Sequence, residues 1–100
     1  MLKKIDCLEF DKLVTEGKGD VFVDFYADWC GPCQSMEPIM EEISESETVY
    51  QVNIDEEQEL AMENEIMSIP CIILFRDGKE VNRLIGICKK KEILGLKDGK

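Results

Sequence analysis

Apolar runs typical of β-strands alternate along the chain with stretches whose apolar residues recur every three or four positions, as on one face of a helix. Residues 21–26, which read VFVDFY, form the strongest run and are apolar at nearly every position. Such continuity is typical of a strand that is buried on both faces. Five segments have a strand pattern: residues 2–5, 21–26, 49–54, 71–75 and 81–85. The dipeptide Asp77-Gly78 predicts a hairpin between the last two.

Helical spacing marks the segments between the strands. Four helices are expected, and they begin after Asp6, after Cys30, after Asp55 and near residue 89. Asp6 and Glu9 have the spacing of a capping box, and Asp55 is expected to cap the third helix, which should end near Met67.

The elements alternate from strand to helix and close with a strand hairpin and a last helix. This order predicts an α/β fold, a sheet covered by helices on both faces. With 100 residues, the chain is expected to form one domain, residues 1–100.

The net charge of -10 narrows the choice of partners. No Lys or Arg lies between Lys18 and Arg76, whereas that stretch holds fourteen of the 22 acidic residues. Such a surface repels phosphate groups, so nucleic-acid and membrane partners are not expected. The acidic stretch either attracts a protein partner with a basic face or serves only as a solvated surface.

Cysteine usage indicates the redox compartment. The five cysteines comprise one close pair and three scattered single residues, which is not the even set of a secreted disulfide framework. The first ten residues contain acidic positions and no apolar segment typical of a secretory signal. We therefore expect a cytoplasmic protein.

Cys30 and Cys33 are the residues most suited to chemistry. They follow the strongest strand at the point where a helix begins, so Cys30 is expected to face free backbone amides and the positive end of the helix dipole. Both effects favour the thiolate, which is the nucleophile of disulfide exchange. Cys30 should attack a substrate disulfide, and Cys33, one turn further and less exposed, should resolve the mixed disulfide. Gly31 allows a tight backbone turn, and Pro32 is well suited to the first turn of a helix.

Three other interpretations of this pair remain open. The first is half of a zinc site, the second is a purely structural disulfide, and the third is an inactive cysteine pair on a scaffold protein. The chain has no His and no second close cysteine pair, and a disulfide across so short a loop adds little entropy. Both facts favour the redox interpretation.

Asp24 is an acidic residue in the middle of the predicted buried strand. Burial raises the pKa of a carboxyl group, which suits it to accept a proton near neutral pH. Our hypothesis is that Asp24 takes the proton of Cys33; the alternative is a structural acid.

Residues 23–33, VDFYADWCGPC, closely resemble the active-site motif of the thioredoxin family, and Ile69-Pro70 resembles its cis-proline motif. Asp77-Gly78 and Gly86 also fall where that family has a hairpin turn and a glycine near the substrate groove. The resemblance covers essentially the whole chain. It implies a central five-stranded mixed sheet with two helices on each face, and a cis bond before Pro70.

The resemblance also implies a function. The family reduces disulfides in client proteins and is recharged by a thioredoxin reductase, without a bound cofactor; we expect a monomer. Substrate-binding residues are expected around the pair: Trp29, Gly31, Pro32, Ile69, Pro70 and Gly86. Two alternatives remain open. Trp29 could serve only as a core residue, and the bond before Pro70 could be trans at an ordinary start of a strand.

The chain departs from the family pattern at several positions. Many members have lysine where Gln34 and Gln51 stand, and threonine where Cys71 follows the proline. Loss of the second lysine should raise the pKa of Asp24 further. Cys71 is either a third reactive thiol or a small buried residue, and we favour the latter. The strongly acidic surface suggests a donor specialised for one partner as a second enzyme function, and a non-catalytic scaffold is the alternative of a different class.

Overall fold

The computed structural model describes residues 2–98. Its strands are β1 (Lys3–Lys4), β2 (Asp20–Tyr26), β3 (Thr48–Asn53), β4 (Cys71–Arg76) and β5 (Lys79–Ile85). Its helical elements are α1 (Cys7–Phe10), the π-helix η1 (Asp11–Thr15), α2 (Gly31–Ile43), α3 (Gln58–Glu63), α4 (Lys90–Gly95) and the 3-10 helix η2 (Leu96–Asp98).

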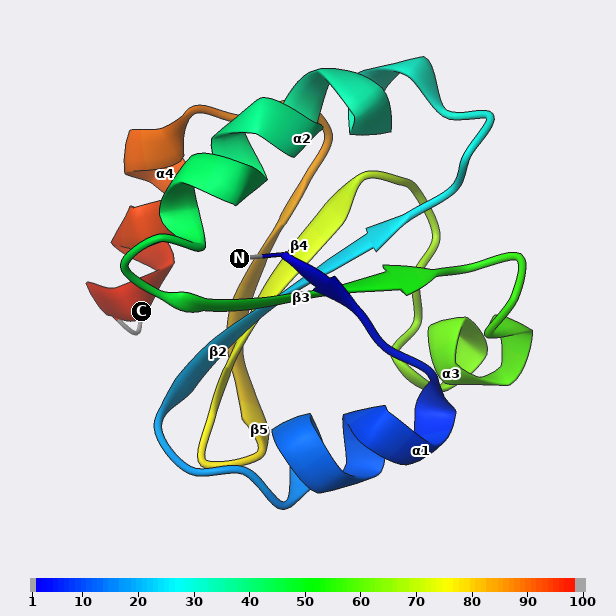
Figure 1. Ribbon diagram of the computed structural model, residues 1–100, viewed down its shortest axis with the longest axis vertical. Coiled ribbons are helices and arrows are strands. Elements are labelled where there is room, and N and C mark those ends of the chain that lie inside the picture. Colours follow the sequence, from blue (N-terminus) through cyan, green and yellow to red (C-terminus); the bar gives the residue numbers. More distant parts are fainter. Residues whose placement is uncertain (1, 99–100) are drawn as a thin grey trace.

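The strands form one sheet in the order β1-β3-β2-β4-β5. β1, β3 and β2 are parallel, whereas β4 is antiparallel to β2 and β5 is antiparallel to β4. In Figure 1, α2 and α4 lie on one side of the sheet, and α1 and α3 lie on the other. The predicted α/β fold with a five-stranded mixed sheet and helices on both faces is confirmed.

Apolar side chains of β2 alternate between two core layers, as the period of two along a strand requires. Val21, Val23 and Phe25 join the layer that includes Phe10 of α1 and Leu60 of α3. Phe22 lies in the opposite layer, whose other members include Met36, Met40 and Ile43 of α2 and Ile93 of α4. Because Asp24 is two residues after Phe22, its carboxyl points toward the α2 side of the sheet.

Two predicted helices, the first and the third, need correction. The capping box of Asp6 and Glu9 is present, but α1 continues as a π-helix rather than as a regular α-helix. Asp55 does not cap the third helix: α3 has Glu57 at its N-cap and makes no side-chain cap hydrogen bond there. This helix ends at Glu63 rather than near Met67, and Glu65, two residues later, has a φ of 54°.

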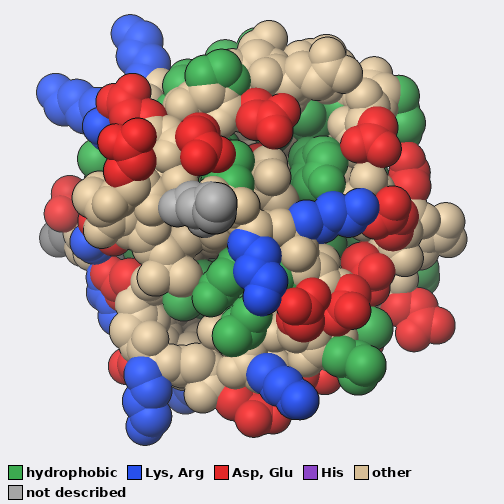
Figure 2. Space-filling view, in the orientation of Figure 1, with side chains coloured by type: hydrophobic (Ala, Val, Ile, Leu, Met, Phe, Trp, Pro, Cys, Tyr) green, Lys and Arg blue, Asp and Glu red, His purple; other side chains and the backbone are tan. Residues whose placement is uncertain are grey.

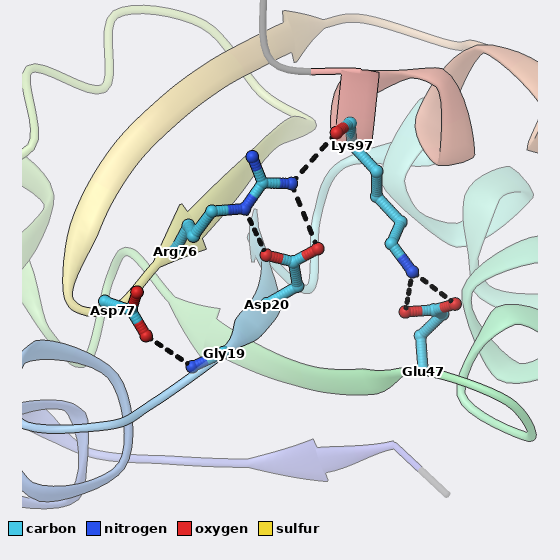
Figure 3. A network of polar contacts seen from close by, with 6 residues as sticks. All are labelled: Gly19, Asp20, Glu47, Arg76, Asp77 and Lys97. Carbon is cyan, nitrogen blue, oxygen red and sulfur yellow. Dashed lines mark hydrogen bonds and ion pairs between the residues drawn. The ribbon is translucent and has the colours of Figure 1, made fainter.

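Charged residues tie together the end of the sheet where β2 begins and β4 ends (Figure 3). Arg76 donates from Nε to Oδ1 of Asp20 at 2.6 Å and from Nη2 to Oδ2 at 3.1 Å. The same Nη2 donates to the backbone oxygen of Lys97 at 2.9 Å, and Lys97 in turn pairs with Glu47. This network fixes the C-terminal helical turn to the sheet, at the opposite end of β2 from the cysteine pair.

Acidic side chains are spread over the face seen in Figure 2, with single basic side chains between them. Within residues 2–98, no helix is long and apolar enough to cross a membrane.

Candidate active site

Cys30 and Cys33 lie where the turn after β2 enters α2. Cys30 is the N-cap residue of this helix, with the extended backbone typical of that position, and Pro32 lies in the first turn. The two cysteines are joined by a disulfide, and their Cα atoms are 5.2 Å apart. The backbone N–H of Cys33 donates to Sγ of Cys30 at 3.2 Å. An amide at a helix N-terminus thus contacts the sulfur of Cys30, an arrangement that stabilises a thiolate in the reduced protein.

The two cysteines are buried to the same degree. Cys30 is 4% exposed and Cys33 is 5% exposed, so the expectation that Cys33 is less exposed was wrong. The residues that flank the pair are exposed: Gly31 and Pro32 between the two cysteines, and Asp28 and Trp29 before them.

Trp29 is a surface residue, with 70% of its area exposed, and not part of the core. Its indole Nε1 donates a 2.8 Å hydrogen bond to Oδ2 of Asp55, which follows β3. The loop of Asp55 is itself ordered by Asn53, whose buried Oδ1 accepts hydrogen bonds from the backbone N–H groups of Asp55 and Glu56.

The Ile69-Pro70 peptide bond is cis, as predicted. Ile69 packs against the small cluster formed by Ala27, Cys30 and Cys33. The backbone N–H of Gly86 donates to the backbone oxygen of Pro70 at 2.8 Å, and Gly86 has a φ of 91°, which favours glycine. The structure thus places Ile69 against the cysteine pair and links Gly86 to Pro70.

Asp24 is 1% exposed and lies opposite Gln51 in the register of β2 and β3. Nε2 of Gln51 donates to Oδ2 of Asp24 at 3.2 Å, and Oδ1 of Asp24 has no hydrogen-bond partner among the described residues. Burial raises the pKa of Asp24 to about 6, which the negative charge of Glu37 supports and the Gln51 hydrogen bond opposes. The acid can therefore gain or lose a proton near neutral pH.

An open cavity of about 480 Å³ lies next to Cys33. Its walls are formed by Tyr26, Ala27, Asp28, Cys33, Gln34, Glu37 and Gln51. It therefore extends from Cys33 to Gln51, the residue that donates a hydrogen bond to Asp24.

The remaining cysteines lie outside the pair. Cys71 and Cys88 are buried, and Cys7 is exposed. Burial raises the pKa of Cys71 and raises that of Cys88 to about 11, so both thiols stay protonated at neutral pH. Within the described part of the chain, no group of three or more acidic, His or Cys side chains is arranged to hold a metal ion.

Sequence reasoning missed Asn53, Asp55 and Glu37 as parts of the site. Tyr26 and Asn53 are paired in register at the carboxyl ends of β2 and β3. Residues that follow the ends of adjacent parallel strands lie near one another, which could have related Asp55 to Trp29. Glu37 lies four residues after Cys33, the spacing of one helical turn.

Comparisons with known proteins agree with this geometry. The thioredoxin family model matches residues 2–96. The chain is 43% identical over 97 residues to a thioredoxin of Chlamydia pneumoniae, covering 94% of this chain and 92% of that protein. It is 41% identical over 81 residues to Thioredoxin-1 of Saccharomyces cerevisiae, with 78% of each chain covered. Among solved structures, a mutant thioredoxin from Halobacterium salinarum matches with a TM-score of 0.88 and 35% identity, covering 95% of this chain and 86% of that one.

Proposed function

The chain belongs to the thioredoxin family and is a protein-disulfide reductase, and we propose that it reduces client proteins by dithiol–disulfide exchange at Cys30 and Cys33. The observation that carries the proposal is the placement of Cys30 as the N-cap of α2, with an amide donated to its sulfur. We further propose that residues 1–100 act as one domain.

Cys30 is the nucleophile of this reaction. Its thiolate attacks a client disulfide and forms a mixed disulfide, and one client sulfur leaves as a thiolate. Cys33 then attacks Sγ of Cys30, the Cys30–Cys33 disulfide forms, and the second client sulfur leaves. Two electrons pass from the chain to the client. The 5.2 Å separation of the Cα atoms supports the closing step.

Asp24 is the proton acceptor for Cys33. Its burial and its pKa of about 6 suit a group that takes up a proton when Cys33 attacks and loses it afterwards. The cavity that Cys33 and Gln51 line supports this role, because Gln51 bonds Asp24 directly.

The client binds over the exposed side of the pair. Trp29 and the exposed Gly31 and Pro32 form one part of this surface. Ile69, Pro70 and Gly86 form the other part, where backbone groups can hold an extended client segment as an added strand. The packing of Ile69 against the cysteines supports this assignment.

The partners are a thioredoxin reductase and disulfide-containing client proteins, with the chain acting as a monomer. A reducing compartment such as the cytoplasm suits the buried free thiols of Cys71 and Cys88. A donor specialised for one basic partner is a second candidate function, which the net charge of -10 favours.

Insulin disulfide reduction with dithiothreitol as electron source tests the proposal. Wild type should accelerate the reaction, and Cys30→Ser should abolish the acceleration. Absence of acceleration by wild type would contradict a general reductant. The Cys33→Ser variant, which cannot resolve mixed disulfides, would then be used to trap partners covalently. A donor specialised for one partner should trap a single protein, whereas a scaffold should trap none.

A further inference from the structure

The cavity beside Cys33 is separate from the surface on which the client is proposed to bind. Its lining residues include Cys33, Glu37 and Gln51 but not Cys30, Trp29, Pro70 or Gly86. At about 480 Å³, it has room for several water molecules. The cavity is therefore a second opening beside Cys33, and it shares no lining residue with the surface proposed for the client.

Gln51 forms the inner wall between this cavity and Asp24. It lines the cavity, and its Nε2 donates to Oδ2 of the buried carboxyl at 3.2 Å. A side-chain amide has both an N–H donor and a C=O acceptor. When the amide is reversed, Gln51 can accept from the O–H of a protonated Asp24. A lysine at this position can pair only with the carboxylate, so Gln51 suits both protonation states.

Glu37 lies at the exposed side of the cavity, one helical turn after Cys33. Its negative charge contributes to the raised pKa of Asp24. Asp28 and Tyr26 also line the cavity, and burial raises the pKa of Tyr26, so its hydroxyl is neutral near pH 7.

The other titratable groups that interact with Asp24 lie on β4 and after β5. They are the thiols of Cys71 and Cys88, which remain protonated because burial raises the pKa of each. No Lys or Arg is among the lining residues of the cavity. The charge of Glu37 therefore acts on Asp24 without a compensating cation in the cavity wall.

We propose that this cavity is the route by which Asp24 exchanges its proton with solvent, with Gln51 holding Asp24 in either protonation state and Glu37 receiving the proton at the outer end. The inference rests on the role proposed above for Asp24. Gln51 and Glu37 act through Asp24 and are positioning residues.

The proton balance of one turnover follows from this arrangement. The thiol of Cys33 gives its proton to the carboxylate of Asp24 as its sulfur bonds to Cys30 and the client sulfur leaves. The proton then moves from Asp24 through water in the cavity to Glu37, and from there to bulk solvent. Asp24 returns to the carboxylate, and no net proton remains on the chain.

A carboxyl titration of the oxidised full chain by NMR is the first test. Glu37→Gln should lower the titration midpoint of Asp24, because it removes a negative charge that favours the protonated form. Glu41→Gln is the matched control, since Glu41 lies one turn further on α2 and does not line the cavity. Gln51→Lys should also lower the midpoint, because a cation pairs only with the carboxylate. A midpoint unchanged in Glu37→Gln, or lowered equally in Glu41→Gln, would overturn the inference.

A single-turnover measurement separates a proton route from a purely electrostatic effect. The reduced chain is mixed with a small disulfide near pH 6, and closure of the Cys30–Cys33 disulfide is followed through Trp29 fluorescence. Glu37→Gln should close about tenfold more slowly in dilute buffer, less than the loss of a whole general base because Asp24 remains. Added formate should restore the rate in this variant and leave wild type unchanged. Closure as fast as wild type, or a slow rate that formate does not restore, would overturn the route.

Asp24→Asn distinguishes failure of the inference from failure of the proposed function. If Asp24→Asn closes the disulfide with the wild-type pH profile, the base role itself fails. If Asp24→Asn loses the acidic limb of that profile while Glu37→Gln matches wild type, only the cavity route fails.

Discussion

The indole Nε1 of Trp29 and Oδ2 of Asp55 are joined by a hydrogen bond of 2.8 Å, so the ring next to Cys30 is held from the loop after the neighbouring strand. This bond crosses between two segments that follow β2 and β3. It orients an aromatic surface that is mostly exposed, where packing alone provides little restraint.

Replacing Asp55 with Ala should therefore weaken client binding without unfolding the chain. We expect a higher KM for insulin reduction with little change in kcat, since the ring loses its orientation but the cysteine pair is untouched. Asp55→Asn retains an acceptor oxygen and should behave like wild type. Trp29 is the single tryptophan, so its fluorescence and its quenching by acrylamide report the freed ring directly. Unchanged quenching and KM in Asp55→Ala would contradict this role.

Stability should fall as pH rises through the titration range of Asp24. Its pKa in the folded chain is raised from 3.8 to about 6, so the folded state holds a proton that the unfolded state releases between these values. Above about pH 6, the buried carboxylate costs up to about 3 kcal/mol, because one pKa unit corresponds to about 1.4 kcal/mol. Asp24→Asn should remove this dependence and be more stable than wild type at pH 7, with a much smaller difference near pH 4. Urea unfolding of the two oxidised proteins at both pH values measures their difference in stability. A difference of the same size at pH 4 and pH 7 would show that titration of Asp24 is not its cause.

The fold was predictable because its strongest signals are local. The continuous apolar run of β2 indicated a strand buried on both faces, and the same run made Asp24 stand out as a buried acid. The pairing of Asp24 with Gln51 depends on the register of β2 and β3, which a single sequence does not reveal. The site was therefore predicted around its motif, whereas the cavity and its outer carboxylate were not.

Asp55 illustrates why element boundaries were less predictable. An Asp before a helical pattern is a common cap, so local preference assigned its side chain to α3. In the structure, the carboxyl bonds the indole of Trp29 instead, a tertiary contact between residues 26 positions apart. The Asp6 capping box was predicted correctly because both of its partners lie within four residues.

Arg83 of β5 holds the segment that leads to Pro70. Its guanidinium donates to the backbone oxygens of Asn64 at 3.0 Å and Glu65 at 3.4 Å, and it pairs with Glu80. These carbonyls belong to the two residues that directly follow α3, of which Glu65 has a positive φ.

Arg83→Met should lower the free energy of unfolding by about 1–3 kcal/mol, because it leaves carbonyl groups and Glu80 without their donor. It should also raise KM for insulin, since the segment before Pro70 is loosened. Arg83→Lys should have a stability and a KM between those of wild type and Arg83→Met, because a lysine ammonium group keeps the charge but lacks the planar donor geometry of a guanidinium. Chemical denaturation and steady-state kinetics measure both effects, and a variant as stable as wild type would show that these bonds contribute nothing.

The network around Arg76 (Figure 3) should affect stability but not redox chemistry. Asp20 begins β2, whereas Cys30 follows the other end of this strand. The Arg76 guanidinium lowers the pKa of Asp20 below its usual value, so the pair stabilises the fold above that usual value and less as pH falls through the lowered pKa. Arg76→Gln should lower the thermal midpoint at pH 7, with a smaller difference from wild type at acidic pH.

Lys90→Gln is the control for this prediction: it removes an exposed ion pair with Glu42 and should have little effect on the thermal midpoint at any pH. Insulin reduction below the melting range should equal wild type in both variants. A loss of activity in folded Arg76→Gln would mean that the two ends of β2 are coupled, contrary to a purely structural role for this network.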